Sequence, residues 1–448
     1  MSVAVASAKD QQGNPRFDVI GVDLPTPEGQ ARIAALNDGL FPFETTDQSL
    51  TDALIDAHRA GNLRATTDPA VYERASVVVV DVHCDISGIA DGKPRMELDG
   101  IRRAVEELGN RLPPGALVIV ETTVPPGTCA RIVAPILENC LQRRGLPSDA
   151  ILLAHAYERV MPGPAYLDSV VRFWRVYAGH TPEAADACEA FLSQVVDVEH
   201  FPLTRLSSTT ASETGKVLEN SYRAMTIAFM EEWGRYAEAV GIDLFEVIDA
   251  IRVRPTHSNM RQPGFGVGGY CLTKDPLFAQ LGARELFGVS DLSFPFCTTA
   301  IDLNRAMPLV TLRKVEHMLG GSLAGKTILL MGVSYRSDVG DTRYSPSETF
   351  AREASARGAR LICHDPLVSH WAEMDMPVLK DLPTLDGVDV IVFTVGHRDY
   401  HQLSLTEWLA DKDVAVFDAN NVLSRVQRDE LRRLGTKTQY IGRGEAIA

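Results

Sequence analysis

Residues Ser76–Val82 read SVVVVDV, an almost uninterrupted run of β-branched side chains. A run of this kind is typical of a parallel strand that helices cover on both faces. Apolar runs of strand length recur at 17–23, 116–120 and 151–159, with helix-like segments between them. Strands that alternate with helices predict a doubly wound α/β sheet in the first part of the chain. A short strand at 171–178 and a helix at 182–195 are expected to complete it.

The last third of the chain repeats this pattern after a glycine-containing linker at 320–326. The expected elements are a helix at 347–356 and strands at 327–333, 360–366, 388–395 and 414–418. The predicted fold class is therefore α/β, with two Rossmann-like doubly wound sheets. Between the sheets, a helical pattern from about residue 210 to residue 240 predicts one long central helix that joins them.

The beginning of the long helix holds a capping pattern and a polar stripe. Thr210 and Glu213 have the spacing of a capping box, with Thr210 as the N-cap. Glu213, Lys216, Asn220 and Arg223 then follow one face of the helix, which usually means a solvated face. In the functional alternative, Lys216 and Asn220 are paired donors to a developing oxyanion. A helix of about thirty residues also commonly bridges domains or packs against its copy in a dimer.

Composition and charge exclude several classes of protein. The chain has 448 residues, 45% of them hydrophobic and 23% charged, which is typical of a globular protein of two or three domains. The net charge of −15 argues against nucleic-acid binding. No apolar run approaches about 18 residues, so no membrane span is expected. The seven cysteines are scattered without metal-ligand spacing, so we expect no metal site and reduced thiols in a cytoplasmic protein.

The N-terminal sheet is expected to lack its first strand and the glycine-rich turn that receives the pyrophosphate of a dinucleotide. Residues 1–8 already form a helix-compatible run, and no Gly-x-Gly-x-x-Gly occurs near the start. Asp23 ends the next expected strand, where an acid would hold the adenosine ribose, and Val82 ends a strand near the same cleft. Either the recorded start lies downstream of the true one, which we favour, or the chain binds its dinucleotide poorly.

Two further strands of this sheet end beside candidate polar groups. Residues 121–128 (ETTVPPGT) contain a Pro-Pro-Gly turn that points Thr123 at the carboxyl edge of the sheet. Ligands of α/β proteins bind at this edge, although a tight turn before a helix is the simpler interpretation. Glu158 closes the expected strand at 151–159, and its acid projects from the same side.

Two loops of the second half carry further candidates. Residues 263–275 (PGFGVGGYCLTKD) place four glycines before a single cysteine, Cys271. Glycines at this density permit positive φ and the close approach of backbone or ligand, so the loop is either a flexible turn or a holder for a nucleophile. The loop at 334–343 carries Arg336 and Arg343, whose guanidinium groups suit a diphosphate; a solvated loop is the alternative.

Together these motifs resemble the UDP-glucose/GDP-mannose dehydrogenase family, the NAD-dependent nucleotide-sugar 6-dehydrogenases. The matching stretches follow one another from about Phe17 to Val422: TTVPPGT at 122–128, ERVMPG at 158–163, KVLENSYR at 216–223, the glycine-rich loop, DTRYSP at 341–346 and FDANNV at 417–422. The resemblance implies an NAD-binding domain at 1–205, a central helical domain that dimerises at 206–315, and a C-terminal nucleotide-sugar-binding domain at 316–448.

The resemblance also implies a chemistry, in which two hydride transfers to NAD convert a sugar C6 alcohol to a carboxylate. Cys271 would form a thiohemiacetal and then a thioester, while Lys216 and Asn220 would stabilise the oxyanions. Glu158 would activate water that is held by Thr123 and Asp275. The implied cofactor-binding residues are Asp23, Val82, Thr123, Lys274 and Arg343. The implied substrate-binding residues are Glu158, Lys216, Arg261, Phe265, Gly268 and Arg336. The implied partners are a nucleotide sugar and a second copy of the chain.

Some positions depart from the family pattern. The glycine-rich fingerprint is missing, VHCD at 82–85 stands where Val-Pro-Thr-Pro is usual, and Tyr157 and Tyr270 replace other residues beside Glu158 and Cys271. One alternative function is therefore a nucleotide-sugar-binding relative without dehydrogenase activity. Another is a hydroxyacid dehydrogenase of the 6-phosphogluconate kind, which ranks last because it needs no catalytic cysteine and no second Rossmann-like unit.

Overall fold

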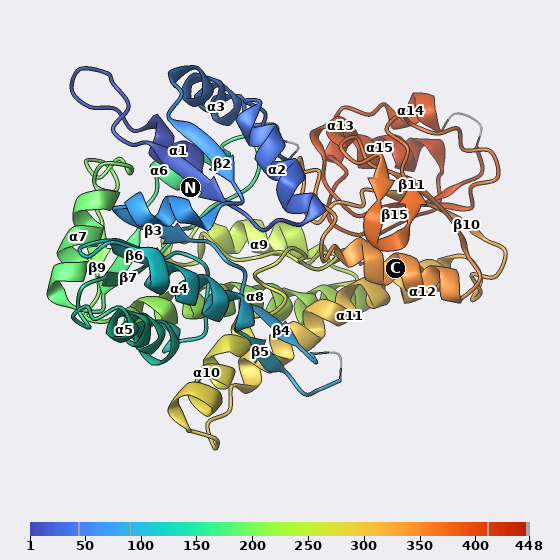
Figure 1. Ribbon diagram of the computed structural model, residues 1–448. Coiled ribbons are helices and arrows are strands. Elements are labelled where there is room, and N and C mark those ends of the chain that lie inside the picture. The colour runs from blue at the N-terminus through green and yellow to red at the C-terminus, as the bar shows by residue number, and fades with distance from the viewer. Residues whose placement is uncertain (44, 90, 410–411, 445–448) are drawn as a thin grey trace. The chain divides into compact units, whose positions relative to one another are not determined.

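The computed structural model describes residues 1–43, 45–89, 91–409 and 412–444 (Figure 1). The chain divides into two compact units. The first comprises Met1–Glu219 and Leu277–Phe294, and the second comprises Asn220–Pro276 and Pro295–Ala448. Among the described residues, none of the helices is both long and apolar enough to cross a membrane.

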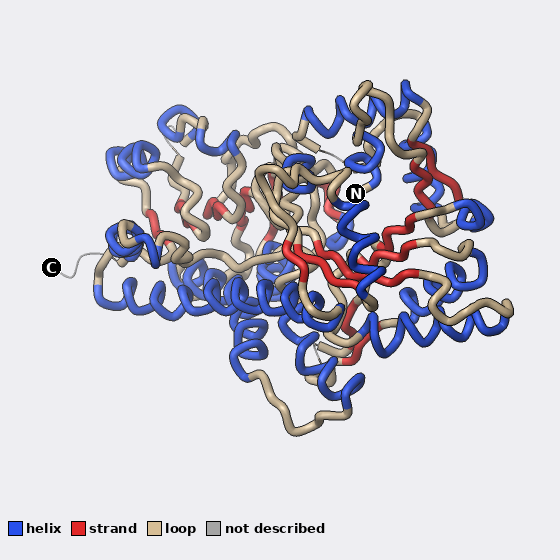
Figure 2. The backbone as a smooth tube through the Cα atoms, turned by 90° about the vertical axis from the view of Figure 1, so that its left-hand side faces the viewer, coloured by secondary structure: helices blue, strands red, loops and turns tan. Residues whose placement is uncertain are grey.

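A five-stranded sheet forms the centre of the first unit. Its order is β3-β6-β7-β8-β9, and β7 and β8 pair antiparallel while the other neighbours are parallel. The strands are β3 (Val77–Val80), β6 (Leu117–Val120), β7 (Leu152–Tyr157), β8 (Val176–Gly179) and β9 (Thr204–Arg205). Strands run side by side next to the N-terminal helix in Figure 2. The accompanying helices are α4 (Asp99–Arg111), α5 (Ala134–Arg143) and α7 (Pro182–Leu192).

The expected strand at 171–178 is only half right. Its first residue ends a helix, α6 (Tyr166–Val171), and the strand β8 begins five residues later at Val176. Within this helix, Ser169 Oγ donates to the Tyr166 carbonyl oxygen at 2.7 Å. The apolar residues of this segment therefore belong to two elements, which their sequence alone did not separate.

A second, two-stranded sheet in the same unit holds β1 (Val19–Val22) parallel to β2 (Leu63–Thr66). Helix α1 (Ser2–Ser7) packs against both sheets, since Val5 lies in a core cluster with Ile119 of β6 and Val3 in one with Leu63 of β2. Among the described residues, β1 pairs with β2 alone and β3 with β6 alone. The described residues contain neither the first strand of the expected sheet nor its glycine-rich turn. Helices α2 (Pro27–Asn37) and α3 (Gln48–Ala60) complete this part of the unit.

The second unit contains a five-stranded parallel sheet in the order β11-β10-β14-β15-β16. The strands are β10 (Thr327–Met331), β11 (Arg360–His364), β14 (Val390–Phe393), β15 (Ala415–Asp418) and β16 (Thr438–Tyr440). Side chains alternate along β10: Leu330 belongs to the core cluster on one face and Leu329 to the cluster on the other. Helices α12 (Pro346–Ala356) and α15 (Arg425–Leu434) accompany the sheet, which confirms the second doubly wound sheet.

The long helix α8 (Thr209–Val240) has 32 residues and contains the boundary between the units. Helices α9 (Leu244–Arg252), α10 (Phe278–Phe287) and α11 (Pro295–Met318) follow it. The sequence analysis did not predict α11, which continues through Pro308 although proline usually interrupts a helix.

The predicted capping box at Thr210 is wrong. Helix α8 begins one residue earlier, and Ser208 Oγ accepts the backbone N–H of Ala211 at 3.2 Å. The Glu213 carboxylate accepts instead from the backbone N–H groups of Gly127 and Cys129, at 2.6 and 2.7 Å. A tertiary contact has therefore taken the carboxylate that the local pattern assigned to the cap.

This assignment of the cap is testable with two alanine variants. Ser208→Ala should lower the free energy of unfolding by about 1 kcal/mol, because it removes the N-cap acceptor. Thr210→Ala should lower it by less than about 0.5 kcal/mol. Urea denaturation of both variants measures the difference, and a larger loss in Thr210→Ala would contradict the cap at Ser208.

Candidate active site

In the first unit, the structure brings Lys216 and Glu158 together. Glu158 directly follows β7, and Lys216 lies on α8 with 8% of its surface exposed. Lys216 Nζ donates to the Glu158 carbonyl oxygen at 2.6 Å and lies 3.9 Å from Oε1 of the same residue. The ammonium group also lies 5.5 Å from the centre of the Tyr157 ring. A fixed cation beside a carboxylate can stabilise a developing negative charge while the carboxylate accepts a proton.

A buried histidine that the sequence analysis missed joins the same two elements. His155, on β7, is fully buried, and its Nδ1 lies 2.8 Å from Ser212 Oγ on α8. Burial, together with the charge of Lys216, lowers the pKa of His155 to about 3, so the imidazole is neutral. Since Ser212 precedes Lys216 by one helical turn, this contact fixes the turn of α8 that carries the lysine.

Glu213 connects α8 to the Pro-Pro-Gly turn that follows β6. Its two hydrogen bonds reach Gly127 and Cys129, on the far side of the turn from Thr123. Gly127 has a φ of 97°, which only glycine adopts readily. A Cβ on Gly127 would also lie 2.5 Å from the Phe287 ring, so the turn is closely packed. The segment is therefore a tight, closely packed turn directly before the helical residues Cys129–Val133 and Ala134–Arg143.

Asp23, which the sequence analysis expects at the adenosine end of NAD, lines a cavity in the first unit. Asp23 follows β1, and its carboxylate accepts from Arg32 Nε at 2.7 Å and from Nη2 at 3.2 Å. The Arg32 hydrogen bond lowers the pKa of Asp23 and keeps the carboxylate ionised. A cavity of about 300 Å³ is lined by both side chains, Gly21 and the first residues of α1. The described residues contain no glycine-rich turn for the pyrophosphate. Val82 packs at the first turns of α4, 3.4 Å from where a Cβ on Gly100 would lie.

In the second unit, close contacts fix the glycine-rich loop. A Cβ on Gly268 would lie 2.4 Å from the Tyr344 carbonyl oxygen, and one on Gly269 would lie 2.9 Å from the Tyr335 ring. Asn304 on α11 accepts from the Val267 N–H at 2.8 Å and donates to its carbonyl at 2.7 Å. These contacts require glycine for backbone approach. They exclude the interpretation of the loop as a flexible turn.

Phe265 anchors the start of the same loop. Its side chain is 2% exposed, and its ring centre lies 5.8 Å from that of Phe350. Gly264 lies against Asn420, and the Phe265 N–H donates to the Asn420 side-chain oxygen at 3.4 Å. Arg261 lies just before this anchor and is half-buried. The predicted substrate-binding residue Phe265 therefore has a clear structural role in the core.

Beside Cys271, a buried carboxylate is shared between two partners. Asp275 accepts from Lys274 Nζ at 2.9 Å and from Asn220 Nδ2 at 2.8 Å, and its own N–H donates to the Cys271 carbonyl at 2.9 Å. Lys274 Nζ also lies 4.4 Å from the centre of the Tyr270 ring. Asp275 is fully buried and Lys274 nearly so. The structure thus brings four of the predicted residues together.

The thiol of Cys271 differs from the others in exposure. Cys271 is exposed, while Cys129, Cys188 and Cys363 are buried, and burial raises the pKa of each of these three thiols. Burial and, after it, the charge of Asp341 raise the pKa of Tyr335 to about 12. Cys271 makes a smaller contribution in the same direction, so Tyr335 lies near the exposed cysteine. Among the described residues, no group of three or more histidine, cysteine or acidic side chains could hold a metal ion.

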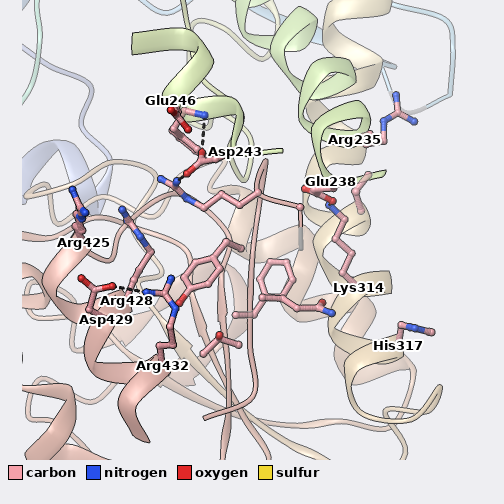
Figure 3. Close-up of a pocket in the computed structure, with 18 of the residues that line it drawn as sticks. Arg235, Glu238, Asp243, Glu246, Lys314, His317, Arg425, Arg428, Asp429 and Arg432 are labelled. Carbon is pink, nitrogen blue, oxygen red and sulfur yellow. Dashed lines mark hydrogen bonds and ion pairs between the residues drawn. The ribbon is translucent and has the colours of Figure 1, made fainter. Parts of the chain in front are cut away.

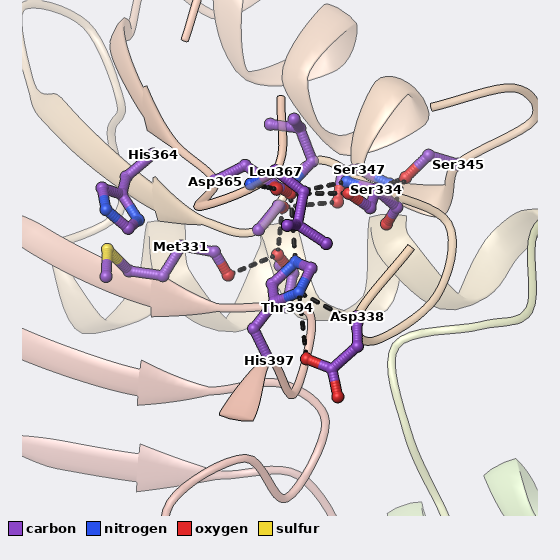
Figure 4. Close-up of polar contacts among 12 residues, drawn as sticks. Met331, Ser334, Asp338, Ser345, Ser347, His364, Asp365, Leu367, Thr394 and His397 are labelled. Atoms are coloured by element: carbon purple, nitrogen blue, oxygen red, sulfur yellow. Dashed lines mark hydrogen bonds and ion pairs between the residues drawn. The ribbon is translucent and has the colours of Figure 1, made fainter. Parts of the chain in front are cut away.

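A buried network holds the loop that carries Arg336 and Arg343 at Ser334 and at Asp338, its first and fifth residues (Figure 4). Asp365 accepts from the Ser334 N–H at 3.0 Å and from its Oγ at 2.8 Å, and lies 3.1 Å from His397 Nε2. The Asp338 N–H donates to His397 Nδ1 at 3.0 Å, so the histidine proton lies on Nε2.

The two arginines of this loop differ in their partners. Arg343 is bound by Asp341, with Nη2 2.6 Å from Oδ2. Arg336 has no carboxylate partner among the described residues, and it lies between the two anchors of the loop. Of the two, Arg336 is therefore the guanidinium group with more free capacity for an anionic ligand.

Three models of one family match the chain. They describe the NAD-binding, central and UDP-binding domains of the UDP-glucose/GDP-mannose dehydrogenase family and match residues 5–195, 210–306 and 329–425. The UDP-N-acetyl-D-mannosamine dehydrogenase of Methanocaldococcus jannaschii is 28% identical over 433 residues, 96% of this chain and 92% of the relative. The NDP-N-acetyl-D-galactosaminuronic acid dehydrogenase of Ralstonia solanacearum is 28% identical over 397 residues, 86% of each chain.

Solved structures share the fold. The UDP-D-ManNAc dehydrogenase of Pyrococcus horikoshii has a TM-score of 0.82 at 24% identity, covering 99% of this chain and 96% of that one. The NDP-N-acetyl-D-galactosaminuronic acid dehydrogenase of Methanosarcina mazei has a TM-score of 0.78 at 25% identity, covering 99% and 93%.

The contact of Glu213 predicts a pH-dependent stability. Burial raises the pKa of Glu213 to about 7, against the effect of the hydrogen bonds from Cys129 and Gly127. Because the folded state then binds more protons than the unfolded state, this group makes the free energy of unfolding fall from about pH 4.5 to about pH 7. Glu213→Gln should remove this contribution, which denaturation at about pH 5 and about pH 8 measures.

Glu219→Gln is the matched control, since Glu219 lies on the same helix with 45% of its side chain exposed. It should keep the pH dependence of the parent chain. If Glu213→Gln and the parent lose stability in parallel over this range, the assigned ionisation of Glu213 is wrong.

Proposed function

This chain belongs to the UDP-glucose/GDP-mannose dehydrogenase family, and we propose that it oxidises the C6 alcohol of a nucleotide sugar to the carboxylate with NAD. The observation that carries the proposal is the exposed Cys271 on a rigid loop, next to the carboxylate that Lys274 and Asn220 share. When bound, NAD supplies the hydride acceptor for each of the two oxidation steps.

Cys271 is the proposed nucleophile between these steps. An aldehyde gives up a second hydride readily only after a nucleophile has made its carbon tetrahedral. The cysteine sulfur bonds to C6, and the thiol proton is lost as the aldehyde oxygen becomes the hydroxyl of a thiohemiacetal. Loss of a hydride and of the hydroxyl proton leaves a thioester. Water then replaces sulfur at C6, which releases the carboxylate and restores the thiol.

The polar residues divide the remaining tasks between them. Lys216 and Asn220 are the proposed donors to the oxyanions, and losing one such donor typically costs about 2.7–4 kcal/mol of transition-state stabilisation. Asn220 is oriented by Asp275, at 2.8 Å. Glu158 is the proposed base that activates water for hydrolysis of the thioester, and Thr123 and Asp275 are proposed to bind this water. Glu158 approaches Lys216 within 3.9 Å, so its negative charge is compensated.

The substrate proposed is a UDP-hexose or a UDP-N-acetylaminohexose. The names of the two relatives given above describe dehydrogenases of N-acetylamino sugars. Arg336, Arg261 and the backbone of Phe265 and Gly268 are proposed for the nucleotide sugar, because guanidinium groups bind phosphate oxygens in pairs. Asp23, Val82, Thr123, Lys274 and Arg343 are proposed on the NAD side. The products would be the corresponding uronic acids.

The assembly proposed is a homodimer through α8. Phe229, Trp233 and Tyr236 follow one another at helical spacing and are about half exposed. Their neighbouring rings meet at 6.3 and 5.6 Å, which forms a continuous aromatic strip. A strip of this kind on a long helix suits burial against a second copy. The described residues form no disulfide, which fits the proposed cytoplasmic setting.

A second candidate function is a nucleotide-sugar-binding relative without dehydrogenase activity. The observation in its favour concerns the proposed NAD site. The described residues there include Asp23, the acid proposed to bind the adenosine ribose, but no glycine-rich turn. Backbone N–H groups of such a turn normally receive the pyrophosphate. Calorimetric titration of the chain with NAD separates the two functions: binding favours the enzyme, and its absence favours the relative.

The proposed nucleophile is tested by Cys271→Ser. This variant should bind the UDP-sugar as the parent does and lose the overall four-electron oxidation by roughly 100-fold or more, because serine forms no thioester. NADH absorbance and product chromatography with a panel of UDP-sugars measure the loss. Cys297→Ser, at a half-buried cysteine outside the loop, is the matched control and should keep full turnover. Full turnover by Cys271→Ser would contradict the mechanism.

A further inference from the structure

A large cavity in the second unit is lined by basic and acidic side chains of several helices (Figure 3). Its volume is about 1580 Å³. The walls come from α8, α9 and α11 on one side and from β16, α15 and the C-terminal residues Arg443 and Gly444 on the other. None of residues 263–275 lines it, so the proposed function gives it no role.

The cavity is rich in positive charge within an acidic chain. Seven arginine and lysine side chains line it against five acidic ones, whereas the whole chain has a net charge of −15. The basic residues are Arg235, Arg313, Lys314, Arg425, Arg428, Arg432 and Arg443, and His317 lies beside them. The acidic residues are Glu238, Asp243, Glu246, Asp249 and Asp429.

Ion pairs do not neutralise all of the positive charge that lines the cavity. Four of the lining cations pair with acids: Lys314 with Glu238, Arg443 with Asp243, Arg432 with Asp429, and Arg235 with Glu231. Asp249 is paired with Arg252, outside the cavity. Among the described residues, Arg313, Arg425 and Arg428 have no carboxylate partner. Three guanidinium groups are therefore available to an anion from solution.

Helix α15 arranges its arginines in a line. Arg425, Arg428 and Arg432 are three and then four residues apart, which places them on one face of the helix. At about 1.5 Å per residue they span about 10 Å along the axis. A single phosphate cannot reach all three, whereas a chain of phosphates can. Arg428 is steadied in this line by a hydrogen bond from Nη1 to the Leu423 carbonyl oxygen at 2.6 Å.

Arg443 provides a further, pre-ordered group on the cavity wall. It pairs with Asp243, donates to the Asn421 side-chain oxygen at 3.0 Å, and stacks 4.3 Å from the centre of the Phe245 ring. Burial lowers its pKa from the usual value of arginine. A guanidinium group held on three sides loses little conformational freedom when a ligand arrives.

We propose that this cavity is a binding site for a polyphosphate anion, either inorganic polyphosphate or the phosphate chain of a nucleoside triphosphate. Guanidinium groups bind phosphate oxygens in pairs, and several of them in a row match successive phosphates. An extended acidic peptide fits less well, because its carboxylates are spaced more widely than the charges of a phosphate chain. The occupant would be an effector, since none of residues 263–275 lines the cavity.

Isothermal titration calorimetry of the full chain with sodium tripolyphosphate, ATP and orthophosphate tests the proposal. Tripolyphosphate should bind at least about tenfold more tightly than orthophosphate, because it contacts more arginines. Arg425→Glu with Arg428→Glu should weaken tripolyphosphate binding by about tenfold or more. If ATP and tripolyphosphate bind with equal affinity, the site recognises the phosphate chain alone. If ATP binds more tightly and the double variant loses that binding, the site recognises a nucleotide.

Arg433→Glu is the matched control. It makes the same change of charge on the same helix, but Arg433 does not line the cavity. This variant should change binding by less than about threefold. If charge reversal unfolds the double variant, Arg425→Gln and Arg428→Gln each replace it, and each should weaken binding by about threefold.

Three results would overturn the proposal. The first is that tripolyphosphate does not bind measurably. The second is that Arg433→Glu and the double variant lose the same amount of tripolyphosphate affinity. The third is a parallel fall in kcat/KM for the nucleotide sugar in the double variant, because the cavity would then belong to the substrate site. The proposal requires kcat/KM to stay within about twofold of the parent in the absence of polyphosphate.

Discussion

The carboxylate of Asp275 is the interaction on which the candidate site depends. It is fully buried, and a buried carboxylate is costly unless a cation and hydrogen-bond donors compensate it. Lys274 supplies the charge and Asn220 supplies a donor from α8, while the Asp275 N–H bonds back to the Cys271 carbonyl. One group therefore joins the cysteine loop to the helix. Removing Lys274 would leave the buried charge without its cation, and removing Asn220 would leave it without its donor from α8, so the position of Cys271 depends on all three side chains.

Close packing adds a second constraint of a different kind. Gly268 and Gly269 lie so near Tyr344 and Tyr335 that a methyl group at either position would collide with them. The loop opposite is held in turn by Asp365 and His397, deep in the second sheet. Hydrogen bonds from a buried network thus set the place of Arg336 and Tyr335. The fold supplies rigidity to two loops whose glycine and charge content alone would suggest mobility.

The sequence predicted those parts of the fold that depend on local pattern. The β-branched run at Ser76–Val82 marks the strand β3, although three of its four residues are only half-buried because β3 lies at the end of its sheet. Core clusters cover both faces of the second sheet. The sequence did not predict α11, since Pro308 signals a break, nor the helix at 166–171. At the site, motifs identified Cys271, Lys216 and Glu158 as candidates. The contact of His155 with Ser212 spans 57 residues and the pairing of Glu213 with Cys129 spans 84, and no local pattern encodes contacts of that kind.

Covalent capture of the sugar by Cys271 is the central claim, and intact-protein mass spectrometry tests it most directly. Glu158→Gln removes the proposed base for thioester hydrolysis, so this variant should accumulate the acylated enzyme when it is mixed with the nucleotide sugar and NAD. We expect a mass increase equal to the nucleotide-sugar acyl group, and peptide mapping should locate it on the peptide that contains Cys271. Turnover of that variant without an adduct, or an adduct on another residue, would contradict it.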